Sequence, residues 1–239
     1  MGISTVKNKN VSWTDTQTNQ GIFDSYNNWI MSADRKVFFK LCMRMNLFNQ
    51  VKDLHGDIVE CGVFKGAGLL SWLKLIDMHQ PHSIKKVIGF DFFDPSFTDS
   101  LESSMDKENM KHVFNRDPSL KSSELSIESI KLKLNNAGFN DNKFELIKGD
   151  ISDTAKLFVE DKPGFRISLL YLDLDLDHPT YDTLEAFWDR VVPGGIVVFD
   201  EYAIYSWTES NAVDRFFKDK KVKIINTNIF SPSAYIIKE

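Results

Sequence analysis

Short apolar runs alternate with amphipathic segments along most of the chain. Five near-continuous apolar runs are typical of strands buried on both faces of a sheet; they cover 57–62, 86–91, 144–150, 167–173 and 196–200. Apolar residues at three- and four-residue spacing, or helix start signals, predict helices between them; these cover 23–51, 67–79, 126–137, 179–191 and 211–218. The last two apolar runs, 223–225 and 235–237, predict a terminal hairpin.

This alternation predicts an α/β fold, a mostly parallel sheet of seven strands with helices on both faces. We expect one domain over residues 21–239, in which helices at 21–55 form an N-terminal extension. That extension either closes the functional site or forms a contact in a homo-oligomer. Residues 1–20 are rich in Ser, Thr, Asn and Lys and predict a polar arm. Residues 92–121 have no clean period and predict a lid-like insertion, because loops of such length are usually functional or mobile.

Composition narrows the class of protein. The chain has 239 residues, 42% of them hydrophobic and 26% charged, as expected for a globular protein with a substantial core. Its net charge of −5 disfavours a nucleic-acid or anionic-membrane partner. The polar residues 1–13 do not predict a signal peptide, and no apolar run reaches the roughly 18 residues of a membrane span. Cys42 and Cys61 lack the spacing of a zinc site, so we expect a cytoplasmic protein.

The segment between the first predicted strand and helix reads ECGVFKGAG. Glycines there permit a tight turn and a close approach of the backbone to a ligand. The pattern is not the GxGxxG that holds a pyrophosphate, and the acid before the first glycine suits a cationic amine such as the ammonium of S-adenosylmethionine. We therefore expect cofactor contacts from Glu60, Gly62, Val63, Phe64, Lys65 and Gly66. The alternative is a turn that needs glycine for packing alone.

Acids at the ends of the next two strands extend this expected cofactor site. Asp91 ends the second strand, where a carboxylate can accept hydrogen bonds from both ribose hydroxyls, and Phe92 follows it. Asp150 ends the third strand and can accept from the adenine amine while Ile151 packs against the ring. The alternatives are that Asp91 is a solvated loop residue and that Asp150 caps the next helix.

Three further acids follow the fourth and fifth strands. Asp173, Asp200 and Glu201 converge if those parallel strands are neighbours. Carboxylates placed together repel one another unless a cation lies between them, and hard oxygen ligands suit Mg²⁺ or another divalent cation. Such a cation can hold an acceptor hydroxyl and lower its pKa. The alternative is that some of these acids face water or cap the helix that begins near Pro179.

Two residues beside this cluster are candidates for proton transfer. Asp175 follows Asp173 closely, and His178 is the histidine next to these acids, with an imidazole suited to accept a proton. Asp173, Asp175 and His178 form the expected catalytic set, although a lone loop histidine is more often a surface residue. Asp173 is also expected to contact the cofactor. The cofactor and acid sites together predict a metal-assisted methyltransferase. One alternative is a metal-independent methyltransferase in which Asp175 or His178 is the base. A non-catalytic nucleoside-binding module is another.

Several of these motifs, in this order, resemble the macrocin O-methyltransferase (TylF-like) family of class I methyltransferases. The resemblance extends from Tyr26 to Phe217 and lies in residues 60–66, 149–154, 172–175, 180–185, 193–195 and 199–202. It implies a Rossmann-like fold and methyl transfer from S-adenosylmethionine to a hydroxyl of a sugar-bearing small molecule.

The resemblance also implies site roles. It assigns Mg²⁺ to Asp173, Asp200 and Glu201 and places Asp173 or Asp175 nearest the acceptor hydroxyl. The chain departs from the family pattern where Glu201 replaces an aspartate, Leu174 replaces a glycine and Asp150 replaces a frequent aromatic residue. Residues 92–120 match no part of the pattern, so the identity of the acceptor does not follow from the resemblance.

Overall fold

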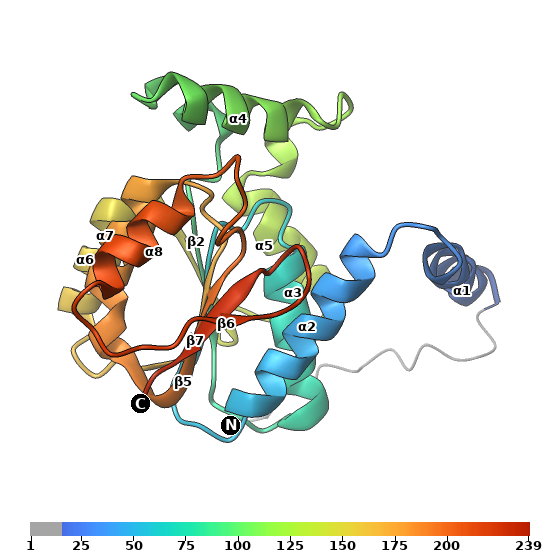
Figure 1. Cartoon of the computed structure of the whole chain (residues 1–239). Coiled ribbons are helices and arrows are strands. Elements are labelled where there is room, and N and C mark those ends of the chain that lie inside the picture. The colour runs from blue at the N-terminus through green and yellow to red at the C-terminus, as the bar shows by residue number, and fades with distance from the viewer. Residues whose placement is uncertain (1–15) are drawn as a thin grey trace.

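The computed structural model describes residues 16–239 and contains one seven-stranded sheet. The strands are β1 Asp57–Cys61, β2 Val87–Asp91, β3 Phe144–Lys148, β4 Ile167–Leu172, β5 Val191–Phe199, β6 Ile225–Asn226 and β7 Ala234–Ile237. Their spatial order is β3-β2-β1-β4-β5-β7-β6, and β7 runs antiparallel to both of its neighbours. The expected α/β fold with a mostly parallel sheet is confirmed (Figure 1).

Helices cover both faces of this sheet. They are α1 Thr16–Ile30, α2 Lys36–Val51, α3 Ala67–His79, α4 Ser104–Asn115, α5 Ile127–Asn136, α6 Ile151–Asp161, α7 Asp177–Phe187 and α8 Glu209–Phe217. Helices α2, α3 and α5 pack on one face, and α6, α7 and α8 on the other (Figure 1). Every residue of β4 is buried: Leu169 and Tyr171 contact the first layer, whereas Leu170 and Leu172 contact the second. Burial on both faces explains why the strands are apolar without alternation.

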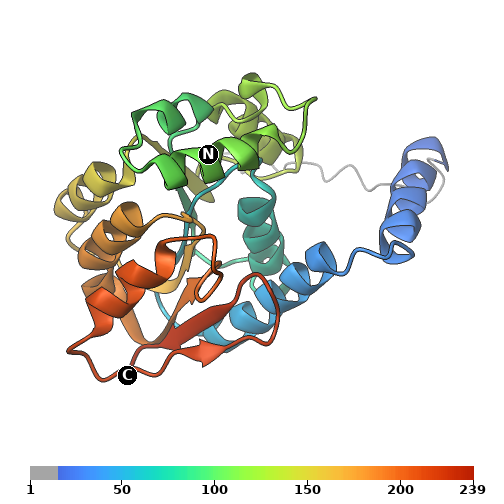
Figure 2. The same cartoon turned by 45° about the horizontal axis from the view of Figure 1, so that its top comes forward.

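The N-terminal extension consists of two helices, α1 and α2. Helix α2 packs against α3, whereas α1 lies away from the sheet and leaves Ile22, Phe23 and Tyr26 exposed (Figures 1 and 2). Residues 16–20, expected in a polar arm, belong to α1, and residues 1–15 lie outside the described part of the chain. Among residues 16–239, no helix combines the length and the apolar character needed to cross a membrane.

The segment at 92–121 is largely helical. It contains a 3₁₀ turn, Pro95–Ser100, and then α4, which lies across the carboxyl edge of the sheet (Figure 1). Met110 is the single buried residue of α4. The apolar positions of this helix that face the cavity, Met110, Val113 and Phe114, fill only its second half, too few to give the segment a recognisable period. We call residues 92–121 the roof segment.

Candidate functional site

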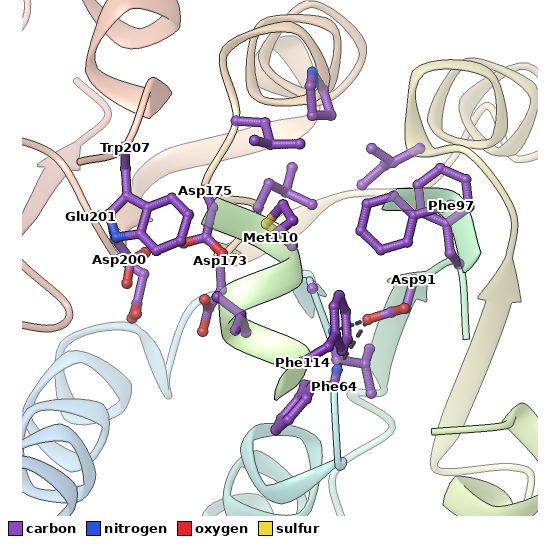
Figure 3. Close-up of a pocket in the computed structure, with 18 of the residues that line it drawn as sticks. Phe64, Asp91, Phe97, Met110, Phe114, Asp173, Asp175, Asp200, Glu201 and Trp207 are labelled. Atoms are coloured by element: carbon purple, nitrogen blue, oxygen red, sulfur yellow. Dashed lines mark hydrogen bonds between the residues drawn. The ribbon is translucent and has the colours of Figure 1, made fainter. Parts of the chain in front are cut away.

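A cavity of about 1170 Å³ lies at the carboxyl ends of the parallel strands, between α2 and the roof segment. Figure 3 shows the acids that follow β4 and β5 on one side of the helix that carries Met110 and Phe114, and Asp91 of β2 on the other side. All residues expected from the sequence line the cavity except Gly66, which lies behind the loop. Parallel strands direct their carboxyl ends to one edge, so residues from distant parts of the chain meet here.

Two glycines of the loop after β1 have structural roles. Gly62 adopts φ +90°, and a Cβ there would collide with the carbonyl oxygen of Asp173, because β1 and β4 end side by side. Gly66 adopts φ +85° at the start of α3, where a Cβ would press on Ile130. Left-handed backbone and close packing therefore account for both glycines. The same turn directs the backbone of Val63 and Phe64 toward the cavity.

Glu60 lies beneath the loop and is only 2% exposed. Its Oε1 accepts a hydrogen bond from Nη2 of Arg44 at 3.1 Å, and its Oε2 is buried without a partner. Burial raises the pKa of Glu60 to about 7, although the charge of Arg44 opposes the rise. The expected acid is thus present at the cavity wall, already paired on one oxygen.

Asp91 holds the loop in place. Its Oδ2 accepts from the backbone N–H groups of Val63 at 2.7 Å and Phe64 at 3.0 Å, and its Oδ1 accepts from Phe93 at 2.7 Å. Figure 3 shows this carboxylate pointing from β2 toward the loop. Asp91 therefore fixes the conformation of the loop after β1 and is not a solvated loop acid.

The remaining expected cofactor residues surround this loop. The ring of Phe92 stacks on that of Phe97, with 4.4 Å between the ring centroids. Lys65 Nζ lies 3.0 Å from Asp117 Oδ2, and this ion pair connects the loop to the roof segment. Asp150 accepts from the backbone N–H of Ser152 at 2.9 Å and thus caps α6, while Ile151 is buried as the first residue of that helix. The capping role of Asp150 is observed, and its carboxylate also lines the cavity.

The acids after β4 and β5 form a tight group. One carboxylate oxygen each from Asp173, Asp175 and Glu201 lies within 4.8 Å of the others. Asp175 adopts φ +66°, and its carbonyl accepts from the backbone N–H of Thr208 at 3.2 Å. Asp175 and Glu201 are each 9% exposed, and Glu201 Oε2 is buried without a partner.

Asp200 lies beside this group but makes other contacts. It is 1% exposed, and it accepts hydrogen bonds from the hydroxyls of Tyr171 and Ser231 and from the ammonium of Lys40 at 2.8 Å. The structure therefore brings Asp173, Asp200 and Glu201 to one place and adds Asp175 to them, with Asp200 joined to Asp173 through Lys40.

Burial and mutual repulsion dominate the electrostatics of the cluster. Burial, followed by the charges of Asp173 and Asp200, raises the pKa of Asp175 to about 7. The same two causes raise the pKa of Glu201 and of the fully buried Glu209 well above the usual range. Burial acts on Asp200 too, but the ammonium of Lys40 and the hydroxyl donors hold its pKa below the usual value. Within the group of three, Asp175 and Glu201 thus lack a cationic partner in the described part of the chain, whereas Asp173 and Asp200 share Lys40.

Two cations of α2 complete the site, and the sequence analysis did not identify them. Lys40 Nζ lies 3.0 Å from Asp173 Oδ2 and 2.8 Å from Asp200 Oδ2, and Arg44, one turn later, pairs with Glu60. The recognisable signal is two basic residues four positions apart on the helix face that continues into buried Leu47.

His178 does not join the acid cluster. Its side chain is 84% exposed at the start of α7, where Nδ1 lies 3.1 Å from Asp182 Oδ2 and 3.5 Å from the hydroxyl of Ser152. These contacts place His178 on the rim of the cavity near the start of α6.

The roof segment is joined to the loop between β5 and α8. Asn109 Nδ2 donates to the carbonyl of Ser206 at 2.6 Å, and the hydroxyl of Thr208 donates to Asp106 Oδ1 at 3.3 Å. Between these residues Trp207 lies next to Glu201 at the cavity (Figure 3). With the link of Lys65 to Asp117 described above, the roof segment is held on two sides of the cavity.

Comparison with known families gives one match over most of the chain. The model of the family described as macrocin-O-methyltransferase (TylF) matches residues 32–236. The 8-demethyl-8-(2,3-dimethoxy-alpha-L-rhamnosyl)-tetracenomycin-C 4'-O-methyltransferase of Streptomyces olivaceus is 26% identical over 149 residues, which are 62% of this chain and 54% of that protein. Mycinamicin III 3''-O-methyltransferase of Micromonospora griseorubida is 27% identical over 158 residues, 65% of this chain and 58% of that protein. The matched region thus spans little more than half of these relatives.

Solved structures share the fold. The apo structure of CalS11, a TDP-rhamnose 3'-O-methyltransferase of calicheamicin biosynthesis, has a TM-score of 0.63 and 23% identity and covers 96% of this chain and 88% of that chain. The O-methyltransferase NovP has a TM-score of 0.68 and 22% identity, with 84% and 79% covered.

Proposed function

This chain belongs to the macrocin-O-methyltransferase (TylF) family, and we propose that it transfers the methyl group of S-adenosylmethionine to a hydroxyl of a sugar or a sugar-containing small metabolite. One observation carries the proposal. A single cavity contains two adjoining parts. The loop after β1, with Asp91, suits a nucleoside, and the cluster of Asp173, Asp175 and Glu201 suits the hydroxyl that accepts the methyl group. The cavity volume exceeds the roughly 300–1,000 Å³ of common ligand pockets, so a cofactor and an acceptor fit together.

The cofactor half is supported by the residues around the loop after β1. Asp91 is positioned to accept from ribose hydroxyls, and Asp150 and Ile151 line the part of the cavity in which we place the adenine. Glu60 Oε2, buried without a partner, is the acceptor for an ammonium group that approaches over the loop. The exposed ring of Phe64 and the stacked ring of Phe92 supply apolar walls.

A divalent cation such as Mg²⁺ fits the acid cluster. Asp173, Asp175 and Glu201 offer the oxygen donors that this ion prefers, and Glu201 Oε2 lacks any other partner. Carboxyl groups also outnumber cations here: Glu60, Asp173, Asp175, Asp200, Glu201 and Glu209 accompany only Lys40 and Arg44 among the described residues. A bound cation would favour the ionised form of the acids whose pKa burial raises. When bound, the cation supplies Lewis acidity that lowers the pKa of the acceptor hydroxyl.

The protein's own contribution is placement of the two reactants. Displacement at a methyl group depends mainly on distance and alignment, which a rigid sheet edge provides. Asp173 or Asp175 lies nearest the acceptor hydroxyl in this proposal. The roof segment covers both halves of the cavity and limits the access of water to the reacting groups.

A metal-independent form of the same reaction has one observation in its favour. Lys40 already places an ammonium between Asp173 and Asp200, so part of the negative charge is neutralised by the protein itself. In that form Asp175, whose pKa burial raises to about 7, accepts the proton of the acceptor. Turnover that survives EDTA identifies this form.

The test begins with calorimetry of S-adenosylmethionine binding to the purified chain, with Mg²⁺ and then with EDTA. We expect micromolar affinity in both, followed by methyl transfer to members of a panel of free, nucleotide-linked and aglycone-linked sugars. Asp173→Asn is expected to abolish transfer and to retain cofactor binding, and Asp99→Asn, at an exposed position of the roof segment, is the control. A folded chain that does not bind the cofactor contradicts the proposal.

A further inference from the structure

Helix α1 lies apart from the rest of the molecule. Among the described elements it packs closely against none, and residues 31–35 lead from it into α2 (Figures 1 and 2). The ring of Trp29 lies 5.9 Å from that of Phe38 between centroids, a contact that joins the end of α1 to the first turn of α2. The helix is therefore held by little of its own chain.

A continuous apolar surface covers α1 and the outer side of α2. On α1 its residues occupy positions 22, 23, 26, 29 and 30, the spacing of one helix face. The ring of Phe38 lies 6.3 Å from that of Phe39 and connects this stripe to α2 through Trp29. We call this the arm surface, and it consists of Ile22, Phe23, Tyr26, Trp29, Ile30, Met31, Phe38, Phe39 and Met45.

The arm surface is larger than the apolar patches that monomers normally expose. Eight of its nine residues are between 38% and 83% exposed. Residues of this size expose roughly 800 Å² at such fractions, whereas the largest apolar patch of a typical monomer covers about 300–600 Å². A stable protein–protein interface buries about 800 Å² on each partner. The arm surface is therefore large enough to form a complete interface.

Helix α1 also needs a partner in order to be helical. A helix of 15 residues is marginal in water even when it is rich in alanine. This one contains Gly21 and no Ala, Leu, Met, Lys, Arg or Glu, which are among the residues of highest helix propensity. Packing of its apolar stripe has to supply the stability, and the described part of the chain offers no surface for that packing.

The charge of the arm surface favours a second copy of this chain as the occupant. In a twofold dimer a patch meets its own image, so it must not carry several charges of one sign. Residues 20–33 contain one charged side chain, Asp24. It lies on the face of α1 opposite the stripe and accepts a hydrogen bond from Gln20 Nε2 at 2.7 Å. The stripe itself is uncharged, so it does not repel its own copy and has no attraction for a strongly charged partner.

A lipid surface fits α1 less well. Helices that lie in a membrane interface carry Lys and Arg on their polar face, where these side chains meet anionic lipid headgroups. Helix α1 contains no basic residue, and its polar side chains are Thr, Gln, Asn, Ser, Tyr and the acid Asp24. Its composition therefore favours a protein neighbour.

We propose that this chain forms a homodimer in which the arm surfaces of two copies pack on each other about a twofold axis. Each α1 then gains the apolar neighbour that its own chain does not supply. Of the two roles expected for the N-terminal extension, this assigns α1 to the contact between copies. The proposal is independent of the proposed function, although the interface adjoins the site: Val37, next to Phe38, lines the cavity.

The experiment measures the molar mass of the purified full chain by light scattering and its dimer dissociation constant by sedimentation equilibrium. We expect wild type to have twice the mass of one chain at micromolar concentration. Phe23→Asp, which places a charge within the arm surface, is expected to raise the dissociation constant at least about 30-fold. Leu132→Asp, at a residue of α5 that is 60% exposed against 57% for Phe23, is the matched control and is expected to leave the constant unchanged.

A second variant and two measurements of the fold accompany this comparison. Met31→Asp changes a residue that is 83% exposed in the connection between α1 and α2, and it is also expected to weaken the dimer. Melting temperature and calorimetry of S-adenosylmethionine on every variant show whether the domain is intact. The same calorimetry tests the methyltransferase proposal separately from the dimer.

Three outcomes would overturn the proposal. One is a wild-type chain that stays monomeric throughout the micromolar range. Another is a dimer that Phe23→Asp and Met31→Asp leave as stable as wild type, because its interface then lies elsewhere. The third is a monomeric chain that cosediments with vesicles of phosphatidylcholine and phosphatidylserine and loses this binding in Phe23→Asp, which would assign the arm surface to a membrane.

Discussion

Arg44 of α2 and Glu60 of β1 form a buried ion pair in which Nη2 and Oε1 are 3.1 Å apart. The guanidinium also lies over the ring of Tyr171, at 4.9 Å from its centroid, and thus connects the N-terminal extension to β4. A helix that precedes the sheet in the chain thereby becomes part of the cavity wall.

Arg44→Met is expected to lower the free energy of unfolding by about 3 kcal/mol at neutral pH, because it leaves a buried carboxylate without its partner. Urea titration measures the change. Arg35→Met, at an exposed position one residue before α2, is the control and is expected to change stability by less than about 0.5 kcal/mol. Equal stability of the two variants would show that the pair contributes nothing.

The stability of the protein is expected to depend on pH through Glu60. Burial raises its pKa from 4.5 to about 7 in the folded state, with Arg44 opposing the rise. Between these values the folded state binds more protons than the unfolded state, so the free energy of unfolding falls as the pH rises. This contribution is fully present below 4.5 and is lost as the pH passes about 7.

Glu60→Gln removes this dependence. We expect its urea midpoint to change less than that of wild type between about pH 5 and pH 7.5, by a difference on the order of 3 kcal/mol in free energy. Identical pH profiles of the two proteins would contradict a raised pKa for Glu60.

Gly68→Ala is expected to disturb the site although alanine favours helices. A Cβ at this position of α3 would collide with Oε1 of Glu60, so the helix or the carboxylate must move. We expect a loss of roughly 1–3 kcal/mol in stability, as for other overpacked sites, and weaker binding of S-adenosylmethionine. Gly164→Ala is the control, since a Cβ there meets nothing within 4 Å. Wild-type affinity for S-adenosylmethionine in Gly68→Ala would show that the Glu60 carboxylate can move aside without affecting cofactor binding.

Asp91→Ala is expected to weaken S-adenosylmethionine binding by about 10- to 100-fold, the equivalent of losing hydrogen bonds to a charged group. The substitution removes the proposed ribose acceptor and also releases the N–H groups of Val63 and Phe64. Calorimetry gives the affinity, and Asp99→Ala on the roof surface serves as the matched control. An unchanged affinity would assign Asp91 a structural role only.

The elements and the edge of the sheet that carries the site were predictable. Apolar runs identify buried strands, and in a parallel sheet their carboxyl ends meet at one edge. Asp91, Asp150, Asp173 and Asp200 were therefore expected at the cavity before the strand order was known, and the structure places them there. The roof helix α4 was not recognised, because its apolar face is limited to one short run, Met110, Val113 and Phe114.

The contacts of Lys40 and Arg44 could not be predicted from local sequence patterns. Lys40 is separated by 133 residues from Asp173 and by 160 from Asp200, and a lysine on an amphipathic helix normally faces water. Only the packing of α2 on the sheet determines that its first turns face the acids.

The sequence by itself determined the succession of strands along the chain, most of the helices between them, the glycine turn after β1 and the identity of the acids at the strand ends, because these depend on local periodicity and on the direction of parallel strands. The tertiary structure alone decided which acids lie together and which two of them, Asp173 and Asp200, pair with Lys40. Those relationships depend on side-chain positions at the scale of a hydrogen bond, and that scale is set by packing between segments far apart in the chain.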